Sequence, residues 1–217
     1  MEKRMHFNEF RNKYSGMPVI KAQTVFASAG KSSQPMRNQI TRWQNKGLLI
    51  QLKKGIYLLN ENDRKVSPSR FFFASQILWP SYISLESALG HYGLIPEAVR
   101  DVTSVTSKKT AVFTNATGKF IYQHIKLEAF RGYTSLKDEA GLNVFIAEPE
   151  KALVDFLYLN LNKFKLSGPD IFRESYRFQN TEILSRRKII FFARIFKNKR
   201  LKALAEEFCK FMEAERK

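Results

Sequence analysis

The stretch from residue 31 to residue 59, KSSQPMRNQITRWQNKGLLIQLKKGIYLL, constrains the fold more than any other part of the chain. Its first half predicts a helix, because two serines suited to an N-cap precede Pro35 and apolar residues then recur at helical spacing. Gly47 predicts the end of that helix. Two short apolar runs follow, Leu48–Leu52 and Ile56–Leu59, and the basic turn between them predicts a tight hairpin.

The polar face of the predicted helix has the composition of a nucleic-acid contact. It offers Arg, Asn, Gln and Thr, whose side chains can pair with base edges, and no Asp or Glu occurs between Glu9 and Glu61. In a winged helix-turn-helix, such a helix enters the major groove and the hairpin tip lies on the backbone. The alternative is an ordinary solvated face. The predicted base-edge contacts are Arg37, Asn38, Thr41, Arg42 and Asn45, and the predicted phosphate or groove-edge contacts are Ser33, Gln34, Lys53 and Lys54.

The residues before this stretch supply the rest of such a module. Apolar spacing predicts helices at 6–14 and 19–29. The order helix, helix, turn, helix, hairpin within about sixty residues matches the DNA-binding module. Residues 60–69 are polar, contain a proline and predict a linker. We therefore predict a winged-helix domain over residues 1–62 and a second domain over residues 67–217.

The second predicted domain mixes helices with strands. Residues rich in β-branched side chains alternate with turn residues in its middle, and apolar residues recur at helical spacing on either side. The fold class is therefore α+β: an N-terminal winged helix-turn-helix, then a mixed α/β domain with a helical C-terminal tail. Helices are expected at 69–78, 84–91, 148–160, 169–177, 181–197 and 199–215, and strands at 81–83, 102–106, 111–113, 119–125, 129–133 and 142–146.

The net charge of +17 is concentrated at the two ends of the chain. Residues 1–60 carry 11 Lys and Arg against 2 acids, residues 67–160 balance at 9 and 9, and residues 161–217 carry 15 against 7. This asymmetry indicates a polyanionic partner. Duplex DNA is favoured over a membrane surface, because no Trp-rich apolar face accompanies the charge, and over RNA, because no RNP-type strand motif occurs.

The basic residues of the C-terminal end lie among apolar residues that predict helices packed on the body. They are expected to face outward, because a buried unpaired charge is costly. Such residues either form a solvated surface or make a second DNA contact that flanks the site of the winged helix. The candidates for that second contact are Arg186, Arg187 and Lys188.

Several sequence blocks, found in order between about residues 7 and 160, carry a family resemblance. They are SYISLESALGHYGLIPE at 81–97, GKFIY at 118–122, HIK at 124–126, FRGY at 130–133, EPEKALVDFLY at 148–158, KGL at 46–48 and KKGIY at 53–57. Together they resemble the AbiEi family of antitoxins. The blocks at 46–57 match the winged-helix half of that family, and the others match its second half. The resemblance does not extend beyond residue 160.

The resemblance implies a two-domain antitoxin that represses its own operon. The winged helix would bind the operator, expected to contain inverted repeats, and the second domain would be needed for antitoxin action. The usual partner gene encodes a nucleotidyltransferase-type toxin, which the antitoxin counters without forming a stable complex. The alternatives are a stand-alone regulator with the same two domains, or a protein-interaction module. The oligomeric state on DNA stays open.

The residues that an enzyme or a metal site would need are scarce. Only three histidines occur, none paired at metal-ligand spacing, and no Gly-rich phosphate loop is present. Glu148 and Glu150, with Asp155 further on, are interpreted as acids near a helix N-terminus rather than as a metal site. We therefore predict no enzyme activity, no cofactor and no bound metal. The single cysteine, Cys209, and the absence of an apolar leader or membrane-length run predict a cytoplasmic protein.

Overall fold

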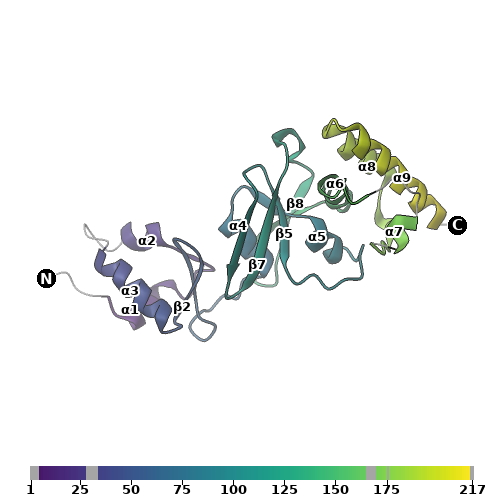
Figure 1. The fold of residues 1–217 in the computed structure, drawn as a ribbon. Coiled ribbons are helices and arrows are strands. Elements are labelled where there is room, and N and C mark those ends of the chain that lie inside the picture. Colours follow the sequence, from purple (N-terminus) through teal and green to yellow (C-terminus); the bar gives the residue numbers. More distant parts are fainter. Residues whose placement is uncertain (1–4, 28–33, 165–169, 175, 216–217) are drawn as a thin grey trace.

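The computed structural model describes residues 5–27, 34–164, 170–174 and 176–215, and it has the predicted α+β class. Within these residues, helices accompany a three-stranded and a six-stranded sheet. The elements follow one another along an elongated molecule (Figure 1). A small N-terminal group of helices and strands lies at one end, the six-stranded sheet lies in the middle, and the last two helices lie at the other end.

The N-terminal module, residues 7–59, contains every element that the first sixty residues predict and one additional strand. Its helices pack around a core that includes Phe10, Val25, Ile40 and Trp43. The sheet has the order β1-β3-β2, and all its strands are antiparallel. The elements are α1 (Phe7–Tyr14), β1 (Ile20–Lys21), α2 (Ala22–Ala27), α3 (Gln34–Asn45), β2 (Leu49–Lys53) and β3 (Ile56–Leu59).

The prediction of a helix from residue 19 is wrong at its start. Ile20 and Lys21 instead form β1, which pairs with Tyr57 and Ile56 of β3. The buried, β-branched side chain of Ile20 suits this short strand, and pairing satisfies backbone groups along the outer edge of β3. The helix therefore begins at Ala22. Its predicted end at residue 29 lies outside the described residues, as does the predicted N-cap of α3.

The central sheet has the strand order β6-β7-β5-β4-β9-β8. Its pairing is mixed, because β4 with β9 and β5 with β7 are parallel and the remaining neighbours are antiparallel. Helices pack on it and bury an apolar core. The elements are α4 (Arg70–Ile77), β4 (Ser81–Ile83), α5 (Leu85–His91), β5 (Val102–Thr106), β6 (Ala111–Asn115), β7 (Gly118–His124), β8 (Tyr133–Lys137), β9 (Asn143–Ala147) and α6 (Pro149–Leu159).

One predicted strand of this region, at 129–133, is wrong. Leu127–Ala129 forms a 3-10 turn, η1, and β8 begins only at Tyr133. Gly132 explains the shift, because its φ of +77° interrupts an extended chain and its carbonyl accepts a hydrogen bond from the Glu148 amide. Beyond this glycine, β8 pairs regularly with β9 and forms one edge of the sheet.

The C-terminal helices share an aromatic core that reaches α6 through the contact between Phe178 and Phe156. Its buried rings Phe172, Phe178, Phe208 and Phe211 form a connected cluster. The helix predicted over 181–197 is shorter, because residues 181–183 form a 3-10 turn before an extended Leu184. The elements are α7 (Asp170–Glu174), η2 (Thr181–Ile183), α8 (Arg186–Ile195) and α9 (Lys199–Glu215).

The hairpin of β2 and β3 joins the N-terminal module to the central sheet. Leu49 and Leu59 face the module's own core, whereas Leu52 and Leu58 are buried in the core of the central sheet. A register shift between Gln51 and Lys53 leaves Leu52 as the extra residue of a β-bulge. The hairpin is therefore packed on both faces, and removal of the central sheet would expose two leucines.

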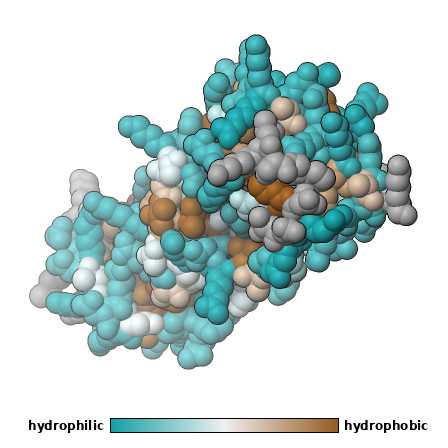
Figure 2. Space-filling view, turned by 45° about the vertical axis from the view of Figure 1, so that its right-hand side comes forward, coloured by the Kyte–Doolittle hydropathy of each residue, from teal (hydrophilic) through white to brown (hydrophobic). Residues whose placement is uncertain are grey.

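The surface around these elements is mostly hydrophilic, with hydrophobic residues exposed in small, separate areas in the view of Figure 2. No helix in the described part of the chain combines the length and hydrophobicity that crossing a membrane requires.

Candidate nucleic-acid interface

Helix α3 divides cleanly into a buried and an exposed face. Met36, Ile40 and Trp43 are buried, and Trp43 packs against the rings of Phe7 and Phe10 with centroids 5.5 and 4.7 Å away. This anchoring fixes the rotation of the helix about its axis. The predicted contact residues on α3 are all exposed: Gln34, Arg37, Asn38, Thr41, Arg42 and Asn45. Ser33, predicted with them, lies outside the described residues.

Several exposed side chains of α3 are held by local contacts. The Gln34 amide donates to Asn38 Oδ1 at 3.0 Å, and the Thr41 hydroxyl donates to the Arg37 carbonyl at 3.1 Å. The Arg37 guanidinium lies over the Phe26 ring of α2, 4.5 Å from its centroid. Such contacts limit the rotamers of four polar side chains before any ligand arrives, which lowers the entropy lost on binding.

Arg42 differs from its neighbours. It is exposed in the middle of the polar face, and no hydrogen bond or ion pair joins its guanidinium to another described residue. A guanidinium carries five donors in a planar fork that matches two acceptors of a guanine edge. Arg42 therefore has its full donor set available for a ligand.

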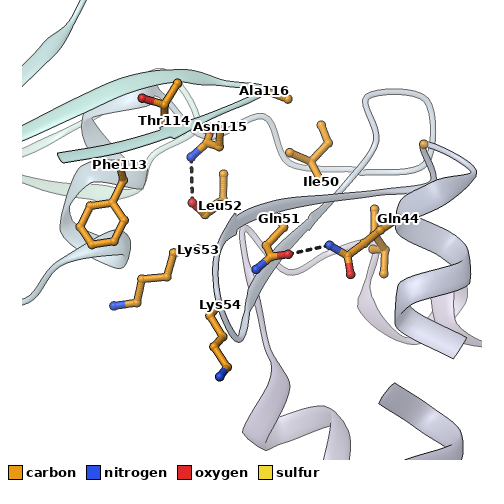
Figure 3. A pocket seen from close by; sticks show the side chains of 12 residues that line it. Gln44, Ile50, Gln51, Leu52, Lys53, Lys54, Phe113, Thr114, Asn115 and Ala116 are labelled. Carbon is orange, nitrogen blue, oxygen red and sulfur yellow. Dashed lines mark hydrogen bonds between the residues drawn. The ribbon is translucent and has the colours of Figure 1, made fainter. Parts of the chain in front are cut away.

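The hairpin tip directs its two lysines in different directions (Figure 3). The Lys53 ammonium donates to the Ile77 carbonyl at 2.5 Å and lies 5.9 Å from the Phe113 ring centroid, so it is turned toward the central sheet. Lys54 is exposed and points away from it. Of the two lysines predicted to contact phosphate, Lys54 is exposed, whereas the Lys53 ammonium already bonds to the Ile77 carbonyl.

A cleft of about 760 Å³ separates β2 from β6, next to this tip. Figure 3 shows its lining, where the Asn115 amide donates to the Leu52 carbonyl at 2.9 Å and Gln44 donates to Gln51 at 2.8 Å. The first bond fixes the edge of the central sheet against the bulge of the hairpin. The cleft is therefore shaped by contacts between the module and the sheet, not by either alone.

A basic loop of the central sheet adds cations that are not among the contacts predicted from the sequence. Lys108 and Lys109 are exposed and line a cleft of about 840 Å³ with Leu78 and His124. His124 Nδ1 contacts the Lys108 carbonyl at 2.9 Å, which ties the loop to β7. The Lys53 ammonium bonds to the Ile77 carbonyl, and the next residue, Leu78, lines this cleft, so the loop lies near the hairpin. Partial burial and the neighbouring Lys108 ammonium lower the pKa of Lys53. In the sequence alone, a turn with two lysines is weak evidence for a nucleic-acid contact. It gains weight only from the fold, which places the turn near the hairpin.

The C-terminal candidates are arranged differently. Arg186 pairs with Glu213 at 2.5 Å, and Lys188 pairs with Glu148 at 2.7 Å and lies 3.9 Å from Glu150. Arg187 is exposed beside them. These acids offset part of the positive charge locally. Helix α8 also lies at the opposite end of the molecule from α3 (Figure 1).

The acids interpreted above as belonging to a helix N-terminus each have their own partner. Glu150 is buried and accepts from the Ser185 amide at 3.0 Å. Asp155 is fully buried, forms an ion pair with Lys151, and accepts from the hydroxyls of Tyr82 and Ser84 at 3.0 and 2.9 Å. Across the described residues, no three His, Cys, Asp or Glu side chains gather as a metal site.

Burial dominates the charge balance of this internal pair. It raises the pKa of Asp155 and lowers the pKa of Lys151, against the attraction between the two groups. The Lys151 ammonium also lies 5.6 and 5.1 Å from the ring centroids of Tyr82 and Phe196. The cluster joins α6 to β4 and to the start of α5. Both charged side chains are wholly inaccessible to solvent, so we assign the cluster a structural role.

Comparisons with known proteins yield no family for this chain: no protein-family model matches it, and no curated protein shows a significant match.

Proposed function

We propose that residues 1–62 form a winged helix-turn-helix that binds duplex DNA sequence-specifically through α3. The observation that carries the proposal is the exposed face of α3, which is free of acids and presents Arg37, Asn38, Arg42 and Asn45 on a helix anchored by Trp43. These side chains supply donors and acceptors for base edges. Thr41 contributes its methyl group, because its hydroxyl is already bonded to the backbone.

The backbone contacts of this proposal come from two places. Lys54 lies at the hairpin tip, where a wing meets phosphate. Lys108 and Lys109 extend the positive surface onto the central sheet, close to Lys53. Phosphate contacts position a protein on duplex DNA, whereas base contacts specify the site. The proposed interface therefore uses α3 for specificity and three lysines for position.

At the level of biological role, we propose an operator-binding repressor that is the antitoxin of a toxin–antitoxin operon. The sequence blocks that resemble the AbiEi family support this role, and most of them lie in β4, α5, β7 and α6 of the central sheet region. The proposed toxin is of the nucleotidyltransferase type and is countered without a stable complex. A stand-alone repressor with the same interface is the second candidate, because an antitoxin and a stand-alone repressor would bind DNA through α3 in the same way.

Two experiments test this proposal at its two levels. DNase footprinting of the full chain on the DNA upstream of its own coding sequence should show a protected site, and Arg42→Ala should require a higher protein concentration to protect it. Co-expression of the full chain with the product of the neighbouring reading frame then separates the two roles. Rescue of growth by the Arg42→Ala variant supports an antitoxin that acts without operator binding, whereas a harmless neighbouring product supports the stand-alone repressor.

A further inference from the structure

Strand β8 is an open edge of the central sheet. In the pairing with β9, Gly132 and Asp138 bond to Glu148 and Leu142, so the even-numbered residues of β8 face β9. The amides and carbonyls of Tyr133, Ser135 and Lys137 therefore point away from the sheet. Four of the five residues of β8 are exposed, and none of the described residues bonds to these outward backbone groups.

This edge has few of the devices that prevent strand pairing. Natural edge strands carry prolines, bulges, several charges or a covering segment. Strand β8, of sequence YTSLK, has no proline and a regular register with β9, and it carries one charge, at its end. The opposite edge, β6, is different, because Asn115 bonds there to the hairpin. An open edge of this kind is a template for one further strand.

We infer that β8 pairs antiparallel with β8 of a second copy of this chain, with Ser135 on the two-fold axis. That register sets each outward-pointing residue opposite another: Ser135 meets Ser135, and Tyr133 meets Lys137. It forms six backbone hydrogen bonds, two for each of three facing pairs. The two six-stranded sheets become one continuous sheet with an isologous interface, in which the same surface serves both copies.

Charge complementarity selects a second copy as the occupant. One residue separates Arg131 from the start of β8 and one separates Glu139 from its end, and both are exposed. The antiparallel pairing therefore brings the Arg131 end of one chain to the Glu139 end of the other, twice across the two-fold axis. Each Lys137 meets the ring of Tyr133, not another lysine, and an ammonium near an aromatic face is attracted to it. No like charges are opposed along β8, from Tyr133 to Lys137.

Exposed aromatic rings beside the edge add apolar area. Tyr133 is 36% exposed and stacks on Tyr82 with centroids 4.7 Å apart. Trp79 is 56% exposed and packs against Phe145, which faces Ser135 across the β8–β9 pair. Aromatic residues are enriched at the cores of protein interfaces. In the paired state, these rings lie next to the shared strands and lose contact with water.

The inference goes beyond DNA binding, and its test uses no DNA, so either proposal can fail without the other. Sedimentation of the full chain over a wide concentration range should show a reversible dimer. Ser135→Pro should remain monomeric, because it removes an outward amide and no bond to β9. Arg131→Glu and Glu139→Arg should each weaken the dimer, and the double exchange should restore it. A monomeric full chain, or a double exchange no better than the single ones, would overturn the inference.

Cross-linking tests the register itself. Facing residues of a hydrogen-bonded antiparallel pair have Cα atoms about 5.5 Å apart, within disulfide range. Ser135→Cys should therefore form an intermolecular disulfide under mild oxidation, while the buried Cys209 stays reduced. Lys137→Cys is the matched control, since two such residues would lie roughly 14 Å apart. Equal cross-linking of the two variants, or none by Ser135→Cys, would refute the register.

Discussion

Alanine substitution of the two adjacent lysines of the hairpin tip should affect two different properties, DNA binding for Lys54 and stability for Lys53. Lys54→Ala removes an exposed ammonium that the proposed interface places on a phosphate. Lys53→Ala removes an ammonium that bonds to the Ile77 carbonyl and lies beside Phe113. The first substitution should weaken DNA binding and leave folding unchanged. The second should weaken folding and leave DNA binding largely unchanged.

The expected sizes follow from these contacts. Each phosphate contact contributes about 0.9 to the slope of log affinity against log salt concentration, so Lys54→Ala should lower that slope by about 0.9. Replacing both lysines should lower it by the same amount and not by about 1.8. A hydrogen bond from a charged donor contributes about 1.5–3 kcal/mol, less where the group is partly exposed. Lys53→Ala should therefore reduce the free energy of unfolding by about 1 kcal/mol.

Fluorescence anisotropy with a labelled duplex, measured over a series of KCl concentrations, gives the slopes, and urea denaturation gives the free energies of unfolding. Lys210→Ala is the control, because Lys210 is exposed on α9 at the far end of the molecule. An equal loss of slope for Lys53→Ala and Lys54→Ala would refute the assignment of Lys53 to the central sheet. An unchanged slope for Lys54→Ala would mean that the hairpin tip does not meet the DNA.

The same assays test other parts of the molecule. Replacing Lys108 and Lys109 by Gln should lower the salt slope by up to about 1.8, whereas replacing Arg186, Arg187 and Lys188 by Gln should leave slope and footprint unchanged. If the substitutions in α8 lower the slope and those at Lys108 and Lys109 do not, the second DNA contact lies on α8. Asp155→Ala should lower the free energy of unfolding by about 3–5 kcal/mol, because it leaves the buried Lys151 ammonium without its ion-pair partner. A cost under about 1 kcal/mol would show that water reaches this pair.

Much of the architecture follows from local sequence patterns. The apolar spacing of Met36, Ile40 and Trp43 is enough to predict α3 and its exposed face. Alternating β-branched runs bounded by turn residues predict most strands of the central sheet in place. These signals are local, because the hydrophobic period and the turn residues lie within one element.

The features that local sequence patterns do not predict depend on contacts between distant residues. β1 exists because the edge of β3 is there to receive Ile20. Lys53 looks the same as Lys54 in sequence, and only the bulge at Leu52 and the carbonyl of Ile77 distinguish them. Likewise, Lys108 and Lys109 become part of a basic surface only when the hairpin packs beside their loop. Such pairings between distant residues cannot be predicted from the local patterns of a single sequence.

The central claim, sequence-specific binding of duplex DNA through α3, is tested most directly by one comparison of affinities. The full chain and its Arg42→Ala variant are titrated, near physiological salt, against the duplex upstream of the coding sequence and a shuffled duplex of equal length and composition. If α3 reads base sequence, the full chain should prefer the upstream duplex by at least about 10³-fold. Arg42→Ala should lose about 1–3 kcal/mol on that duplex and almost nothing on the shuffled one. Equal affinity of the full chain for both duplexes would contradict sequence-specific binding through α3.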